Sequence, residues 1–364
     1  MVILHISYAS TWGGGEQQMI DLIHALNDLG IKNPLVCFKN SALHKYVVKN
    51  NLDFVSIETK NLKSLQHIIK NSEANLLHIH TGSFIKDFIL LNIFYGLSIP
   101  CVYTINGIMR KKSFMSRLKY NYSKIDAIHF VSNAAKNHFK NEVAFKKSYK
   151  KLHTIYDGIQ VNNAKLPIDT NVITNLSNNP DAFFVGNVAN HTRAKNLISF
   201  IETAKILVHD MGMKNLKFVQ IGRESKLTEP LNQAIIDYDL SNHVFLLGFI
   251  ENAQAYISLF DTLLITSNRE GLPLTIMEAF KHNVPVVSTD AGGIPEAIET
   301  GENGFLSPIN DHKGLALQIL ELRNNKQLAV KFATRSQAIL QERFTANKMG
   351  ENTLKLYNSI LHGN

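Results

Sequence analysis

Two glutamates eight residues apart, Glu270 and Glu278, bracket a turn between a predicted strand and a predicted helix. The residues before them, Asp261–Thr266, are apolar and rich in β-branched side chains, as in a short buried strand. Pro273 stands where the first helical residue is expected, because its missing N–H costs nothing at that position. The pattern therefore predicts a strand, a turn that carries the Glu270-Gly271 pair, and a helix.

The start of this helix is a predicted anion site. The backbone amides of Leu274 and Thr275 have no partner inside a helix that begins there, and the positive end of the helix dipole suits a phosphate. Glu278 follows Leu274 by four residues and shares its helix face. We expect the amides to hold a pyrophosphate while Glu278 accepts hydrogen bonds from a ribose. The alternative is an ordinary strand–loop–helix unit with two surface glutamates.

A glycine-rich stretch, Trp12–Gln17, follows the first predicted strand and opens a predicted helix. Gly14 and Gly15 would let the backbone approach a ligand closely and would expose amides at the helix start. The spacing is not the G-x-G-x-x-G of dinucleotide binders. The alternative is a flexible connection in which Glu16 favours the helix dipole.

A basic pair, Arg193 and Lys195, lies on a predicted loop that enters a helix. Two cations in that setting form a good anion clamp. The alternative is a pair of solvent-exposed cations on a turn.

Two histidines end one of the predicted strands, and the alternation of side chains points His78 and His80 to the same side. We expect a structural role for His78 and a place in the ligand site for His80. Metal binding needs at least a third ligand, which the sequence pattern does not place, so no metal site is predicted. In the next strand-to-loop segment, Asn106 can donate a hydrogen bond to a sugar hydroxyl but cannot carry a proton at neutral pH.

Strands alternate with helical patterns along the whole chain, which predicts two doubly wound parallel α/β domains. The expected strands are Val2–Tyr8, Pro34–Phe38, Leu76–His80, Pro100–Ile105, Ala127–Ser132, Leu152–Ile155, Ala182–Val188, Leu216–Ile221, Val244–Leu247, Thr262–Thr266 and Val284–Ser288. The expected helices include Gln17–Leu29, Asn196–Met211 and Leu274–His282.

The domains are expected at residues 1–165 and 178–346, joined by a polar linker near 162–180, with a ligand cleft between them. A C-terminal helix within 347–364 is expected to pack back on the first domain.

Composition limits the classes of protein to which this chain can belong. A chain of 364 residues with 45% hydrophobic content can bury two cores. Cys37 and Cys101 lie in apolar runs, so we expect both to be buried free thiols, which fits a reducing compartment. The apolar window Phe88–Ile105 contains Asn92 and Pro100 and is no credible membrane span, and the N-terminus lacks a signal pattern. We therefore expect a cytoplasmic protein.

Charge is unevenly placed. Residues 1–170 hold 21 Lys and Arg against 11 Asp and Glu, whereas residues 171–364 hold 17 against 19. The stretch Arg110–Tyr122 mixes cations with aromatic residues, and Lys146, Lys147, Lys150 and Lys151 form a second basic cluster. A basic first half of this kind suits an anionic partner, which would be either the inner leaflet of a membrane or an acidic acceptor. The alternative is that these cations form a solvated helix face.

The segment Glu270–Ala279 resembles the paired-glutamate signature of the retaining family 4 (group 1) glycosyltransferases, which have the GT-B fold. Gly13–Glu16, the Lys195 loop, Ala291–Glu296 and Gly301–Leu306 are similar to family segments in the same order. Three positions depart from the family pattern: Asn106 stands where histidine is usual, Asp157 where asparagine is usual, and Asn187 where arginine is usual.

This resemblance implies a nucleoside diphosphate sugar as donor and a lipid-linked or growing polysaccharide, of the lipopolysaccharide or capsule type, as acceptor. Lys195 and Arg193 would neutralise the pyrophosphate, Gly271, Leu274 and Thr275 would add backbone contacts, and Glu270 would orient the sugar. The donor is a substrate and no cofactor is expected. The resemblance also implies that transfer retains the anomeric configuration. No Asp-x-Asp pair ends a predicted strand, so no divalent metal is expected.

Two alternatives stay open at this point. Another GT-B enzyme, such as a sugar-nucleotide epimerase, should show a fuller set of acid–base residues. A nucleic-acid-binding function would explain the excess of Lys and Arg in residues 1–170. The sequence lacks the aromatic motifs of RNA-binding domains, the Cys and His spacing of zinc fingers and a basic helix followed by dimerisation heptads, so no nucleic-acid partner is expected.

Overall fold

The computed structural model describes residues 1–109, 112–161 and 168–363. Its contacts divide the chain into two compact units, Met1–Gln160 together with Arg343–Asn364, and Val161–Glu342. The predicted linker near 162–180 falls partly outside the described residues, and the rest of it contains the short helix α7, Asn171–Thr174.

The first unit is built on a seven-stranded sheet of order β3-β2-β1-β4-β5-β6-β7, in which every pairing is parallel. Its strands are β1 Ile3–Ile6, β2 Leu35–Phe38, β3 Phe54–Ile57, β4 Leu76–Ile79, β5 Cys101–Ile105, β6 Ala127–Phe130 and β7 Leu152–Thr154. Most of these strands are buried along their length, which explains their apolar sequences. The sequence analysis missed β3, because this edge strand exposes Val55 and Ser56 and lacks an apolar run.

Helices connect these strands, as parallel pairing requires. They are α1 Gly14–Asp28, α2 Ala42–Lys49, α3 Leu62–Asn71, α4 Phe84–Tyr95, α5 Phe114–Tyr120, α6 Asn133–Glu142 and the 3₁₀ segment η1 Lys146–Lys151, with α13 Ala346–His362 added from the C-terminus. Cys37 and Cys101 are buried free thiols.

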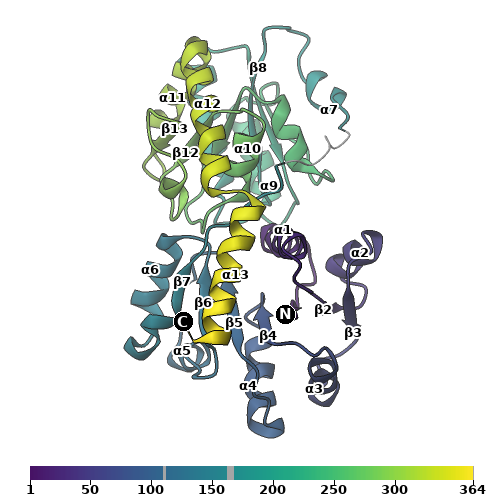
Figure 1. Ribbon diagram of the computed structural model, residues 1–364. Coiled ribbons are helices and arrows are strands. Elements are labelled where there is room, and N and C mark those ends of the chain that lie inside the picture. The colour runs from purple at the N-terminus through teal and green to yellow at the C-terminus, as the bar shows by residue number, and fades with distance from the viewer. Residues whose placement is uncertain (110–111, 162–167, 364) are drawn as a thin grey trace. The chain divides into compact units, whose positions relative to one another are not determined.

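The helix α13 lies beside α1 on one face of the first sheet (Figure 1). Its buried residues Met349 and Tyr357 join a core with Leu22 and Leu26 of α1. A Cβ atom on Gly350 would come within 2.8 Å of the Ala25 Cβ, so glycine is what allows the two helices to approach so closely. The chain thus leaves the first unit and returns to complete it.

The second unit is built on a six-stranded parallel sheet of order β10-β9-β8-β11-β12-β13. Its strands are β8 Phe183–Val188, β9 Leu216–Ile221, β10 Val244–Leu246, β11 Thr262–Ile265, β12 Val286–Thr289 and β13 Gly304–Ser307. The sequence analysis missed β13, a four-residue edge strand that begins with glycine.

Helices cover this second sheet as well. They are α8 Leu197–Lys205 with the π-helical turn η2 Ile206–Asp210, α9 Thr228–Asp237, η3 Ala253–Leu259, α10 Leu274–Lys281, η4 Ile294–Glu296, α11 His312–Asn324 and α12 Lys326–Arg343. In the described part of the chain, none of the helices has both the length and the apolar content needed to cross a bilayer.

Both sheets reverse their winding direction at one point. In the first unit this point lies between β1 and β4, and in the second between β8 and β11. Ligands of open parallel sheets bind outside the carboxyl ends of the strands that flank such a switch point. The loops that follow β1, β4, β8 and β11 are therefore the places to look for a site.

Candidate functional site

The loops after β8 and β11 are tied to each other at the switch point of the second unit. The Thr266 hydroxyl is 3.3 Å from the carbonyl oxygen of Lys195 and 3.2 Å from that of Asn196, and the Asn268 amide donates to the Ala194 carbonyl at 2.8 Å. These bonds fix the loop that carries the basic pair against the turn that carries Glu270.

This arrangement brings Lys195 and Glu270 together. Lys195 Nζ lies 2.6 Å from Glu270 Oε1, and the hydroxyl of Ser267 donates to the same oxygen at 2.6 Å. The side chains keep 28% and 10% of their surface exposed, so the pair is reachable but poorly hydrated. Both hydrogen bonds go to Oε1, and in the described part of the chain Oε2 receives none. The sequence analysis missed Ser267, although it lies only three residues before Glu270 on the same turn.

The start of α10 has the features of an anion site. Pro273 is the N-cap residue with φ −74° and ψ 129°, no side chain caps the helix, and its first turn carries no acidic residue. The prediction that Pro273 is the first helical residue is wrong by one position, because an extended ψ keeps it outside the helix. The amides of Leu274 and Thr275 thus begin the helix without a side-chain partner, three residues after the buried Gly271.

Glu278 lies one turn further along α10, in a poorly hydrated position. Burial raises the pKa of its carboxyl to about 7, and the nearby Lys281 opposes this rise. The group is therefore close to half-ionised at neutral pH, and any ligand that donates hydrogen bonds to it would favour the ionised form.

Arg193 has different surroundings from Lys195. Its exposed side chain lines an open pocket of about 360 Å³, whose other lining residues include Asn196, Leu227, Pro230 and Asn268. The two predicted cations of the clamp therefore lie on one loop, and only Lys195 contacts Glu270.

Asn187, which replaces the arginine usual in the family, is buried inside β8. Its amide Nδ2 donates to the carbonyl of Leu264 at 2.8 Å, across the switch point. This side chain joins β8 to β11 rather than offering a charge to a ligand.

In the first unit, the glycine loop begins α1 with Gly13 as N-cap residue. A Cβ atom on Gly14 would meet nothing within 4 Å, whereas one on Gly15 would lie 2.6 Å from Asn106 Nδ2. The side chain of Asn106 therefore fills the space beside Gly15. Asn106 Oδ1 is buried and has no hydrogen-bond partner among the described residues.

The carboxylate of Glu16 already covers part of the α1 start. Burial raises its pKa, and hydrogen bonds from the backbone N–H groups of Glu16 and Gly13 oppose this rise. A ligand anion at this helix start would therefore compete with the protein's own carboxylate.

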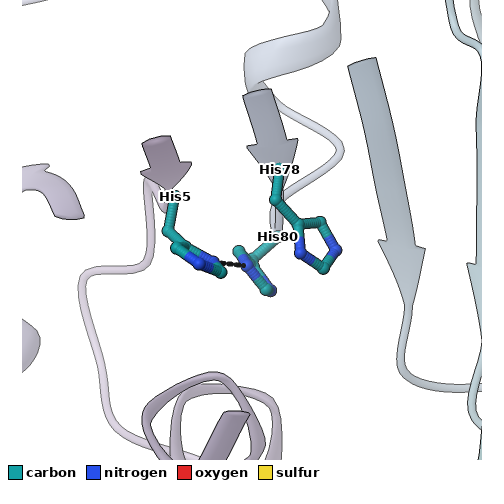
Figure 2. Close-up of side chains that lie close together, drawn as sticks. All are labelled: His5, His78 and His80. Atoms are coloured by element: carbon teal, nitrogen blue, oxygen red, sulfur yellow. Dashed lines mark hydrogen bonds between the residues drawn. The ribbon is translucent and has the colours of Figure 1, made fainter. Parts of the chain in front are cut away.

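His80 follows β4 and is 8% exposed. Its Nε2 atom lies 2.9 Å from Nδ1 of His5, and the His78 ring lies against both (Figure 2). The sequence analysis found no third histidine beside His78 and His80, and the structure places His5 there. His5 and His78 are direct partners in the register of β1 and β4, a pairing that the sequence pattern does not reveal.

Two family models match this chain. The model for glycosyl transferases of group 1 matches residues 179–325, and the model for glycosyltransferase family 4 matches residues 12–163.

Among curated relatives, N-acetyl-alpha-D-glucosaminyl L-malate synthase of Bacillus anthracis is 25% identical over 188 residues, which are 47% of this chain and 49% of the relative. This chain thus spans about half the length of that relative. The UDP-Gal:alpha-D-GlcNAc-diphosphoundecaprenol alpha-1,3-galactosyltransferase of Escherichia coli is 22% identical over 311 residues, which are 82% of this chain and 79% of the relative.

Among solved structures, HepE from Anabaena, crystallised with UDP and glucose, has a TM-score of 0.86 and 19% identity, with 99% of this chain and 100% of that chain covered. This similarity confirms the predicted fold class, GT-B with two Rossmann-like domains.

Proposed function

Since the chain belongs to the group 1 glycosyltransferases of family 4, we propose that it moves a sugar from a nucleoside diphosphate sugar to a lipid-linked or growing polysaccharide acceptor. The family assignment favours this activity over a sugar-nucleotide epimerase or a nucleic-acid binder. The name of the Escherichia coli relative states a UDP-galactose donor and a diphosphoundecaprenol-linked acceptor, which is an acceptor of the proposed class. The Anabaena structure holds UDP and glucose in the same fold.

The observation that carries the proposal is the Lys195–Glu270 pair beside the uncapped start of α10. Breaking the anomeric C–O bond builds negative charge on the departing diphosphate. Lys195 and the amides of Leu274 and Thr275 are donors that can stabilise this charge where it develops. Among the described residues, the hydrogen bonds to the Glu270 carboxylate all go to Oε1. Oε2 is therefore the oxygen that we assign to the sugar hydroxyls.

The ribose and the second cation complete the proposed donor site. We assign the ribose hydroxyls to Glu278, whose ionised form they would favour, and a further phosphate contact to Arg193. Gly14 offers an open backbone approach in the first unit. We assign Asn106 Oδ1 and His80 to the acceptor or to the sugar, as hydrogen-bond partners. In this role Asn106 cannot carry a proton.

We further propose that transfer retains the anomeric configuration and that no metal bridges the donor diphosphate, because Lys195 and the helix amides already supply positive charge. The anomeric coupling in a proton NMR spectrum of the first-formed product reads the configuration directly, and an inverted product contradicts retention. Loss of activity in EDTA that Mg²⁺ or Mn²⁺ restores would contradict the metal-free diphosphate site.

A thermal-shift panel of UDP, GDP, ADP and their sugars tests the proposed donor class. A ligand at one hundred times its dissociation constant should stabilise the protein by about 2.7 kcal/mol. We expect one of the nucleotides, with or without its sugar, to stand out. Equal and negligible shifts for all of them would contradict a nucleoside diphosphate sugar as donor.

We also propose that the first unit docks on an anionic membrane surface. Arg117 of α5 donates to the carbonyls of Val143 and Ala144 at 3.1 and 3.4 Å, and its guanidinium lies 5.0 Å from the ring centroid of Phe145. This contact places α5 beside η1, so two basic segments that are distant in sequence share one surface.

Exposed apolar side chains stand among the cations of this surface, which we call the α5–η1 face. Its exposed apolar residues are Phe114, Met115, Leu118 and Tyr149, and its cations are Lys112, Lys146, Lys147 and Lys150. Apolar side chains that enter the headgroup region together with cations that attract anionic lipids are the features of peripheral membrane binding.

Two predicted members of this face play another role. Lys119 Nζ donates to the Gly82 carbonyl at 2.8 Å and lies 4.5 Å from the ring centroid of Tyr120, while burial lowers its pKa. Lys119 and Arg117 therefore hold α5 in place rather than standing free for a lipid. Arg110 and Lys111, which were also expected on this surface, lie outside the described residues.

A further inference from the structure

Three histidines of the first unit meet beneath α1 and α13, and the proposed sugar transfer gives them no common role. His5 pairs with His78 in the parallel register of β1 and β4, and His80 follows His78 by two residues, so all three rings share one sheet face. Each offers one ring nitrogen, and these nitrogens all lie within 4.8 Å of one another (Figure 2). Coordination at the usual Zn–N distance of about 2.0 to 2.1 Å would draw these nitrogens closer together.

The three rings are enclosed in the first unit. His5 and His78 are fully buried and His80 nearly so. Burial favours the neutral form of an imidazole, which is the form that binds a metal.

The hydrogen bonds around His5 aim its lone pair at the cluster. Asn33 donates its amide to Asn27 Oδ1 and to the Ile31 carbonyl, so its Oδ1 atom faces His5 Nε2 as an acceptor at 3.2 Å. His5 must then carry its proton on Nε2, which leaves the lone pair of Nδ1 directed at His80. A histidine whose second nitrogen donates to an amide oxygen is the usual arrangement of a metal ligand.

His80 leaves one nitrogen without a partner. Its Nε2 atom faces His5 Nδ1 at 2.9 Å, and its buried Nδ1 atom has no hydrogen-bond partner among the described residues. The one proton of neutral His80 can serve only one of these two positions. Such a ring carries a buried lone pair that the protein does not satisfy, which is costly unless a cation or another donor binds it.

His78 supplies the third ring and its support. Its Nδ1 atom lies 2.5 Å from the Tyr357 hydroxyl and its Nε2 atom 2.6 Å from the Thr104 hydroxyl. On metal binding His78 would exchange one of these contacts for the ion and keep the other, which would hold the ring in orientation.

We propose that His5, His78 and His80 form a three-histidine zinc site in the first unit. Three imidazoles suit Zn²⁺ and leave a fourth position for a water molecule. The ion would link β1 to β4, the two strands that flank the switch point from which the Gly14 loop and His80 itself project. The ion is separate from the metal-free diphosphate chemistry assigned to Lys195 in the second unit.

Zinc content of the untagged full-length chain tests the site independently of any transfer activity. After loading with Zn²⁺ and desalting into metal-free buffer, elemental analysis should find about one ion per wild-type chain and less than about one fifth of an ion per chain for His80→Gln. The matched control is His129→Gln, which removes another buried imidazole of the same sheet face. His129 contacts Thr104 and the Ile155 carbonyl and lies outside the cluster; this variant should keep its zinc.

A second measurement guards against a variant that fails to fold. The wild-type chain loaded with Co²⁺ should show the intense visible absorption of a tetrahedral site with nitrogen ligands, and Zn²⁺ should displace it. A wild-type chain that retains no zinc and gives no such absorption would overturn the proposal, leaving a purely hydrogen-bonded histidine cluster. Equal zinc in wild type and a folded His80→Gln variant would overturn it as well.

Discussion

At the scale of single residues, the Lys195–Glu270 pair joins the cation that we assign to the diphosphate and the carboxylate that we assign to the sugar. If Lys195 faces the donor diphosphate, Lys195→Ala removes a charge-assisted hydrogen bond of about 1.5 to 3 kcal/mol, which corresponds to a roughly 10- to 150-fold loss of affinity. The loss should appear for the nucleoside diphosphate and be nearly absent for the nucleoside. Calorimetric titration of both ligands measures the difference.

The matched control for this change is Lys214→Ala, which removes an exposed cation of the same unit from a turn before β9. Its diphosphate affinity should stay within about twofold of wild type, since exposed charges act weakly through salt solution. An equal loss in both variants would mean that general charge, and not a built site, attracts the diphosphate.

Glu278 makes a prediction about pH. Its folded pKa of about 7 lies above the usual 4.5, so its ionisation opposes folding. This cost is absent below the unfolded pKa, grows as pH rises toward 7, and is constant above. A ribose that donates to the carboxylate binds the ionised form, so nucleotide affinity should fall about tenfold from pH 8 to pH 6. Glu278→Gln should flatten that profile; an unchanged slope in the variant would remove Glu278 from the site.

At the scale of elements, the start of α10 lets stability and binding be separated. An acidic residue in the first turn of a helix favours the dipole by about 0.3 to 1 kcal/mol. Thr275→Asp should therefore preserve or raise the melting temperature while weakening nucleoside diphosphate binding through repulsion. Thr275→Asn, of similar shape and no charge, is the control and should bind far better than the aspartate variant. Diphosphate affinity that is unaffected by the aspartate would show that the α10 start is not the anion site.

The elements also show how far sequence reasoning reaches. The apolar runs predict the buried strands, and their alternation with helices predicts two parallel sheets, because each central strand must be apolar on both faces. The edge strands β3 and β13 escape that logic, since each has only four residues and one of them is a serine.

Site residues divide in the same way. Local pattern suffices for the α10 start and for the Lys195 loop, which are contiguous in sequence. It does not reveal that Lys195 reaches Glu270, that Asn106 fills the space beside Gly15, or that His5 lies against His80. Each of these contacts depends on which strands become neighbours, which no single segment encodes.

At the scale of the whole molecule, part of the excess of cations in residues 1–170 lies on the α5–η1 face, which we propose as a membrane-docking surface. Each Lys near an anionic surface contributes about 1 kcal/mol, so its four cations suffice for reversible attachment. Co-sedimentation with anionic vesicles should fall with salt and drop sharply when Lys112, Lys146, Lys147 and Lys150 are all replaced by glutamine.

The control variant replaces Lys45, Lys49, Lys63 and Lys70 of α2 and α3 by glutamine and should co-sediment as wild type does. Equal recovery with neutral and anionic vesicles would rule out this electrostatic mode and leave the face to a soluble acidic acceptor.

The account as a whole depends on Glu270 acting on the donor sugar and not on the nucleotide. The direct measurement is the rate of nucleoside diphosphate release from the stabilising nucleotide sugar, for wild type and Glu270→Gln, with nucleotide affinity measured on the same samples. We predict that the variant loses the rate by about 100-fold or more, as for other groups that act in the transition state, while its nucleoside diphosphate affinity stays within about threefold of wild type. A variant that keeps its rate, or one that loses rate and nucleotide affinity in equal measure, would contradict the role assigned to Glu270.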